Sequence, residues 1–168
     1  MTTMIDVIEL LEHDHRLIEA LAEQLELASD PTEVRRLFFT IVEELAAHEA
    51  AEQTVVFPAF RAVVEPSDDS TLIHRMSEHE ELNELLAEMR CLAPTGFGFT
   101  KRGSALMLDV KAHFLLEEET VFLRMRETFS GEDLVELGRQ ALDVKQRSPA
   151  FPDDHPRLAD RRNDAVTR

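Results

Sequence analysis

The chain has 168 residues, of which 43% are hydrophobic and 31% are charged, and only 5 are glycine. This length allows one domain with a buried core, and the composition indicates a globular, helix-rich protein. A net charge of −16 would repel phosphate backbones and acidic lipids, so we expect neither nucleic acid nor membrane as a partner.

Five helical segments can be predicted in chain order. The first spans about residues 4–28, because its apolar residues recur at steps of three and four. The second spans about residues 31–64, with Asp30 as its N-terminal cap. Pro58 lies inside this second segment and should kink it, because proline donates no backbone hydrogen bond.

The second half of the chain repeats this organisation. A third helix is predicted at about residues 69–92, and the connection 93–99, with its proline and glycines, should end it. The fourth helix begins near Thr100 and ends before Ser130, and a shorter fifth helix spans about residues 132–147.

Long helices joined by short links are typical of an up-down four-helix bundle. We therefore predict an all-α protein in which residues 1–129 form the bundle and residues 130–147 form an additional helix. Residues 148–168 are rich in proline and charge without a helical period, so we expect them to form a flexible tail.

The second and fourth segments contain the same pattern, 65 residues apart. HEAAEQTVVF begins at His48 and HFLLEEETVF begins at His113, so each histidine is followed four residues later by Glu52 or Glu117. The first and third segments correspond at an offset of 64, which aligns His15, Ile18 and Leu21 with His79, Leu82 and Leu85. We interpret the repeat as two half-sites related by a pseudo-twofold axis. The alternative, a duplication that kept packing residues alone, gives no reason to keep histidine.

Six polar residues occupy positions where the helical period places apolar side chains. They are His15, His48, Glu52, His79, His113 and Glu117. A histidine and a glutamate four residues apart share one helix face, within reach of one metal ion. One such histidine alone could be a hydrogen-bonded core residue, but buried carboxylates need positive charge, and no lysine or arginine interrupts these four stripes. The pattern therefore predicts a metal site in the bundle core.

Imidazole and carboxylate ligands on facing helices suit a di-iron or di-manganese site, whereas structural zinc prefers thiolates. The chain has no tyrosine, which excludes a tyrosine ligand, and Cys91 is its only cysteine. No internal disulfide can form, and the first residues lack the order of a signal peptide. We therefore expect a cytoplasmic protein.

These motifs resemble those of the hemerythrin-like (hemerythrin HHE cation-binding) family. The resemblance spans about residues 5–127 and rests on EHDHRLIEAL, HEAAEQTVVFP, EHEELNEL and HFLLEEETVF. It implies a bundle that holds two iron ions joined by an oxo or hydroxo bridge. The implied ligands are Glu52 and Glu117 as bridges, His15 and His48 on one ion, and His79 and His113 on the other.

Two positions differ from the oxygen-carrying members of that family. The carriers have a second histidine one turn before the third-helix ligand, where this chain has Arg75, which cannot ligate as a cation. They also have an aspartate five residues after the fourth-helix histidine, whereas the apolar stripe here favours Glu117, at four. Glu118, at five, is a fallback ligand should the helix rotate. These differences argue against simple oxygen transport.

Three functions remain open from the sequence. The first is a peroxidase- or catalase-like redox activity, in which the di-iron centre consumes peroxide, nitric oxide or dioxygen. The alternative is a module that binds, senses or stores oxygen or iron without turnover, and the third is a metal-free interaction bundle. We favour the first, with a small diatomic or peroxide ligand as the partner and a monomeric chain.

Overall fold

A computed structural model of the chain describes residues 5–63 and 97–147. These residues are almost entirely helical and include no β-strand, which confirms the predicted all-α fold class. The third predicted helix, which carries Arg75 and His79, and the predicted tail lie outside the described residues. None of the helices within the described ranges is both long enough and apolar enough to cross a membrane.

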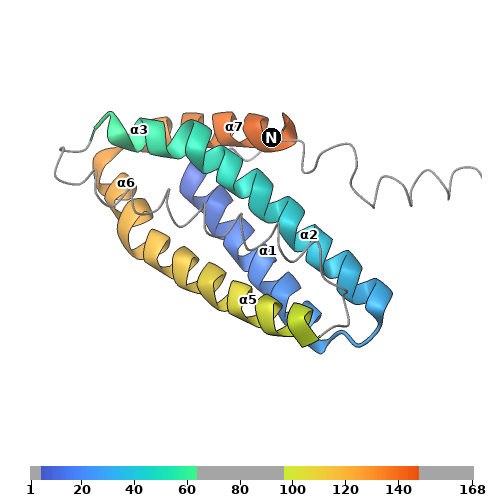
Figure 1. Ribbon diagram of the computed structural model, residues 1–168. Helices are drawn as coiled ribbons and strands as arrows, with labels where there is room; N and C mark the ends of the chain where they lie inside the picture. Colours follow the sequence, from blue (N-terminus) through green and yellow to red (C-terminus); the bar gives the residue numbers. More distant parts are fainter. Residues whose placement is uncertain (1–4, 64–96, 148–168) are drawn as a thin grey trace, which may run out of the picture.

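Three long helical rods and one further helix make up the described structure (Figure 1). Two of the rods contain a π-helical turn. In chain order the elements are α1 (Val7–Leu27), α2 (Pro31–Ala51), η1 (Glu52–Val56), α3 (Phe57–Arg61), α5 (Phe97–Glu117), η3 (Glu118–Phe122), α6 (Leu123–Thr128) and α7 (Gly131–Arg147).

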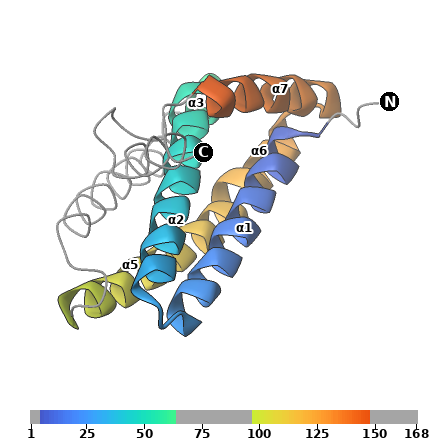
Figure 2. The same ribbon diagram turned by 90° about the vertical axis from the view of Figure 1, so that its right-hand side faces the viewer.

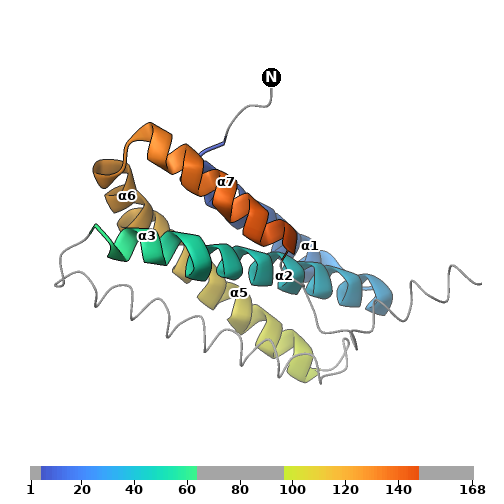
Figure 3. The ribbon, with the colours of Figure 1, turned by 90° about the horizontal axis from the view of Figure 1, so that it is seen from above.

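The rods lie side by side, and α7 crosses one end of them. Figure 2 shows α1, α2 and α5 running along the bundle, with α7 lying across the end where α1 begins and where α3 and α6 lie. Seen from above, α7 covers much of α1 and runs beside α2 (Figure 3). It contacts α1, α2 and η1, so the additional helix packs on the bundle instead of extending away from it.

Side-chain caps set the starts of the first two helices. The Asp6 carboxylate accepts the backbone N–H of Glu9 at 2.8 Å, so α1 begins at Val7, later than the sequence predicted. The second helix begins where it was predicted, because the Asp30 carboxylate accepts the N–H of Glu33 at 2.9 Å and Pro31 occupies the first turn.

The prediction that α5 would begin near Thr100 was wrong. The structure describes this helix from Phe97 onward, so part of the predicted connection is helical. Phe99 is buried, and its ring packs edge-on against Phe38 at 5.1 Å between ring centres. This aromatic contact accounts for the earlier start, because apolar burial outweighs the low helix propensity of nearby glycine.

Pro58 does not by itself explain the irregularity in the second rod. The irregularity is the π-helical turn η1, in which the N–H of Phe57 donates to the carbonyl of Glu52, five residues back. An equivalent π-helical turn, η3, follows Glu117 in the rod formed by α5, η3 and α6. No proline is present in that rod. Each wide turn comes directly at or after an inward glutamate. Such π-helical turns are frequent at functional sites.

A polar layer divides the hydrophobic core into two clusters. The cluster beneath α7 contains Val7, Ile8, Leu10, Leu11, Ala51, Val55, Val56, Phe57, Phe60, Val121, Phe122, Met125, Leu134, Leu137 and Ala141. The cluster toward the other end contains Ile18, Ala22, Val34, Phe38, Phe39, Ile41, Val42, Leu45, Phe99, Leu106, Met107, Val110 and Phe114. The inward histidines and glutamates lie between these clusters along each rod.

Candidate metal centre

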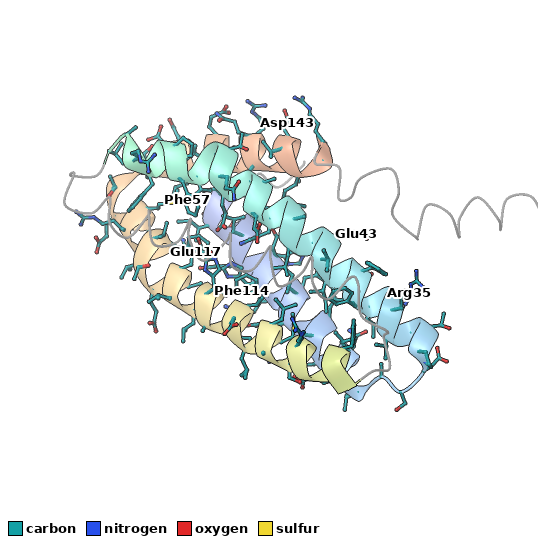
Figure 4. The ribbon with its side chains drawn as sticks, in the orientation of Figure 1. Arg35, Glu43, Phe57, Phe114, Glu117 and Asp143 are labelled. Atoms are coloured by element: carbon teal, nitrogen blue, oxygen red, sulfur yellow. The ribbon has the colours of Figure 1, made fainter. Side chains whose placement is uncertain are left out.

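The structure brings together the sequence-predicted site residues that lie within its described ranges. They are His15 on α1, His48 on α2, Glu52 at the start of η1, and His113 and Glu117 on α5, and all of them are buried. Figure 4 shows Glu117 and Phe114 inside the bundle, between α5 and α1. His79 lies outside the described residues, so its position beside this cluster stays a prediction.

The cluster contains two overlapping groups of potential ligands. Atoms of His15, His48 and Glu117 lie within 4.8 Å of one another, and so do atoms of Glu52, His113 and Glu117. Glu117 therefore belongs to both groups. The roles of these residues as ligands stay predictions.

The imidazole Nε2 atoms point toward the carboxylates. His15 Nε2 lies 3.5 Å from Glu117 Oε2, and His48 Nε2 lies 3.3 Å from Glu52 Oε1. His113 Nε2 lies 3.9 Å from Glu117 Oε2. The Nε2 atoms of His15 and His48 are only 3.3 Å apart. Nitrogen lone pairs and carboxylate oxygens thus face one small volume.

The donor set fits a divalent transition metal. Both carboxylate oxygens of Glu117 are buried and accept no hydrogen bond from any described residue. A carboxylate in a dry core is costly unless a positive charge or donor compensates it. Imidazole and carboxylate together are suitable ligands for iron, manganese or zinc, so a bound cation accounts for this unsatisfied group.

The second ring nitrogen of two histidines contacts a carboxylate. His48 Nδ1 lies 3.3 Å from Asp14 Oδ2, and Lys145 of α7 donates to the same oxygen. Carboxylates in this position fix the tautomer and orientation of metal-binding histidines. Sequence reasoning missed both residues. Asp14 follows buried Leu10 by four residues, and Lys145 follows buried Ala141 by four, so the helical period alone marks both positions as inward.

His15 has a matching arrangement nearer the surface. Its Nδ1 lies 2.8 Å from Glu118 Oε1, and Arg16 donates to the same oxygen. The sequence offered Glu118 as a fallback ligand, but its carboxylate contacts the nitrogen of His15 that faces away from Glu117. In the structure, therefore, Glu118 is placed to orient His15.

The pKa values of His15 and His48 are shifted in opposite directions. Burial lowers the pKa of His15 to about 4, although the nearby carboxylate of Glu117 opposes this shift. Burial would also lower the pKa of His48, but the carboxylates of Glu52, Asp14 and Glu117 raise it well above its usual range. Burial would raise the pKa of Glu52, and the facing His48 lowers it instead. The carboxylates around His48 thus favour positive charge at this position, either a proton on the ring or a bound cation in its place.

Two phenylalanines form an apolar wall beside His15. Its ring stacks on Phe114 at 3.9 Å between centres, and it also lies near-parallel to Phe122 at 5.6 Å. Phe114 also meets His48 nearly edge-on at 5.6 Å. These rings restrict the rotamers of both histidines and keep water away from their Nε2 atoms. The lower local dielectric strengthens charge interactions at the cluster.

Comparisons with known proteins identify the group that this chain resembles. Residues 6–126 match the Hemerythrin HHE cation binding domain. A relative from Nostoc sp. (strain PCC 7120 / SAG 25.82 / UTEX 2576), named DNA nickase, is 28% identical over 124 residues, which cover 74% of this chain but only 34% of that protein.

One similar solved structure is a Hemerythrin HHE cation binding domain-containing protein from Mycobacterium kansasii. It matches with a TM-score of 0.73 at 21% sequence identity, over 86% of this chain and 87% of that one. At this identity the likeness concerns the fold. The helix α7, which spans Gly131–Arg147, lies beyond the residues that match the domain.

Proposed function

This chain belongs to the hemerythrin HHE cation-binding domain family, and from that premise we propose that its buried cluster holds two iron ions that react with a small oxidant. The oxidant would be hydrogen peroxide, nitric oxide or dioxygen. The observation that carries the proposal is the position of Glu117, which is buried, without a hydrogen bond from any described residue, and shared by both groups of potential ligands.

A pair of metal ions fits the cluster better than a single ion. His15 and His48 form one group of potential ligands with Glu117, and Glu52 and His113 form a second group with it. Carboxylates contributed by facing helices, with a histidine one turn away, are the usual ligands of paired iron sites in helical bundles. The family match says that the domain binds cations, and the choice of iron and of two ions is our proposal.

Iron suits the donor atoms and the expected reaction. The described residues include no cysteine, because the single cysteine is Cys91, so a thiolate-rich structural zinc site is a poorer fit. When bound, iron would supply Lewis acidity and the electrons that reduction of an oxidant requires. The chain supplies orientation, since Asp14 and Glu118 contact the outer nitrogens of two histidines, and the phenylalanines beside His15 exclude water.

Binding without turnover is the second candidate function. The contact between Lys145 of α7 and Asp14 joins an element outside the matched domain to a carboxylate beside His48. A metal ion or small ligand that moved His48 could thereby move α7, as a sensor requires. This observation favours sensing over storage within the second candidate.

Nucleic acid remains outside the proposal. The Nostoc relative is named for an action on DNA, but the chain spans about a third of that protein's length. The net charge of −16 would oppose binding to a phosphate backbone. We propose instead a monomeric protein whose partners are small molecules, without a nucleic-acid or membrane partner.

The functional test compares iron-loaded and zinc-loaded protein. The full chain would be reconstituted anaerobically with ferrous iron, and a matched sample with zinc, and metal content would be measured after desalting. We expect about two iron ions per chain. On addition of hydrogen peroxide, the iron form should either evolve oxygen or oxidise a reporter dye, and the zinc form should do neither.

Two other results would redirect the proposal. Iron content with no faster peroxide loss than in the zinc control would support the binding or sensing candidate. Failure to retain any iron would contradict both and leave the metal-free bundle as the remaining interpretation.

A further inference from the structure

The buried face of α7 ends in a lysine. Leu134, Leu137 and Ala141 pack against the bundle, and Lys145 follows one turn after Ala141 on the same side. The side chain of Lys145 is only 13% exposed, and its ammonium group donates a hydrogen bond to Asp14 Oδ2. A lysine rarely gives up its hydration unless a partner compensates it, and here the partner is a buried carboxylate.

Asp14 connects this lysine to the metal cluster. Its Oδ2 atom, which accepts from Lys145, also lies 3.3 Å from His48 Nδ1, and the side chains of Asp14 and His48 are 5% and 1% exposed. The other nitrogen of the ring, Nε2, faces Glu52 at 3.3 Å. Three charged or polar groups from α7, α1 and α2 thus form a continuous series of contacts. The series ends at His48 Nε2, the predicted ligand atom.

The chemistry of these linked contacts gives Lys145 a role beyond holding α7 against the bundle. A carboxylate at Nδ1 keeps the proton there and leaves the Nε2 lone pair directed toward a metal. The carboxylate can stay in the core only while its charge is compensated. Removal of the lysine would leave the buried Asp14 with less compensation, and the carboxylate would then turn toward water and release the ring of His48.

We propose that Lys145 is a positioning residue of the metal centre, which acts through Asp14 to hold His48 in its metal-binding orientation. The inference rests on the proposed metal site, and it extends that site to a helix outside the matched family domain. The equivalent contact of His15 involves Arg16, whose side chain is 57% exposed, so solvent can replace it. Lys145, at 13% exposure, is the less exposed of the two cations, and its loss should matter more.

The first test measures cobalt(II) binding by the full metal-free chain. Cobalt(II) is used because its visible absorption spectrum depends on the ligands that bind it. We expect Lys145→Met to weaken cobalt binding by about tenfold, at the low end of effects seen for such supporting partners, and to alter the visible spectrum. Lys145→Arg should restore most of the affinity. The control is Arg147→Met, which removes the same charge from the same helix at a side chain that is 81% exposed, and it should behave as wild type.

A double-substitution cycle tests whether Lys145 acts through Asp14. Asp14→Asn should weaken cobalt binding at least as much as Lys145→Met, and the combined variant should lose little more than Asp14→Asn alone. Independent losses that multiply would mean that the two residues do not act on one path, and the proposal would then fail.

A metal-free measurement separates this inference from the proposed function. In nitrogen-15-labelled protein, the Nδ1–H proton of His48 should exchange slowly with water in wild type and quickly in Lys145→Met. If wild-type protein binds no cobalt, the proposed metal site is contradicted. The exchange rate of the His48 Nδ1–H proton would still decide the role of Lys145. Unchanged exchange and unchanged cobalt affinity in Lys145→Met would overturn the inference. So would equal losses of cobalt affinity in Lys145→Met and Lys145→Arg, because Lys145 would then only fasten α7.

Discussion

Replacing Glu117 by glutamine should reduce the iron content from about two ions per chain to one or none. We expect this to be the largest loss of metal from any single substitution among the described residues, because Glu117 is the one carboxylate in both ligand groups. Glutamine keeps the shape of the side chain but offers a neutral amide, which binds iron poorly. Metal analysis after anaerobic reconstitution with ferrous iron measures the result.

The same substitution should abolish stabilisation by metal. A ligand present at a thousand times its dissociation constant stabilises the folded state by about 4 kcal/mol. Wild-type protein should therefore unfold at a clearly higher temperature with iron than without, and Glu117→Gln should show little difference. Without metal the variant should unfold no more easily than wild type, because it no longer buries a carboxylate that lacks a hydrogen bond from any described residue.

The run of three glutamates provides its own controls. Glu117 is buried in the cluster, Glu118 contacts His15 Nδ1 at 2.8 Å, and Glu119 is exposed. Loss of iron should therefore be severe for Glu117→Gln, intermediate for Glu118→Gln and absent for Glu119→Gln. If Glu119→Gln lost as much iron as Glu117→Gln, the metal would be bound elsewhere than in this cluster.

Hydrophobic periodicity predicted five of the buried polar side chains, although Asp14 and Glu49 are also buried and were not predicted. His48 and Glu52 continue the stripe of Leu45, and a helical period leaves them no other direction to point. The same reasoning identified Glu117, and not Glu118, as the inward residue, and the structure buries Glu117 completely. Orientation around a single helix is a local property, so sequence alone can specify it.

The supporting contacts could not be predicted in this way. Lys145 and Asp14 are 131 residues apart, and their contact depends on where α7 crosses the bundle. The apolar stripes of the first four predicted helices contain no lysine, and Lys145 lies on the fifth. Helical periodicity places Lys145 on the buried side of α7, but only the packed structure shows which anion it meets.

The π-helical turns were also beyond the reach of periodicity. A single wide turn shifts the helix by about one residue, and an apolar stripe tolerates that shift without a visible break. Pro58 suggested an irregularity near the right place for only one of the two rods. The shared feature is the buried glutamate at or just before each turn, Glu52 in one rod and Glu117 in the other.

The position of α7 can be tested by Gly138→Ala, which should destabilise the protein by about 1–3 kcal/mol. A Cβ atom at Gly138 would lie 2.5 Å from the carbonyl oxygen of Ile5 and 2.9 Å from the backbone nitrogen of Val7. These are backbone atoms, which cannot rotate away as a side chain would, so α7 or the start of α1 must move. Denaturant unfolding of the metal-free protein measures the loss.

Helix propensity alone would make Gly138→Ala stabilising, whereas the backbone contact makes it destabilising. The sign of the change in unfolding free energy therefore shows which effect is larger. Alanine inside a helix is favoured over glycine by about 1 kcal/mol, so without the backbone contact Gly138→Ala would stabilise α7. Gly131→Ala in the same helix is the matched control, because nothing lies within 4 Å of a Cβ atom there. It should be neutral or slightly stabilising. If both variants were equally stable, α7 would not pack this closely on α1. If Gly138→Ala alone loses stability, its cobalt affinity should fall as well, because the displaced helix is the one that presents Lys145 to Asp14.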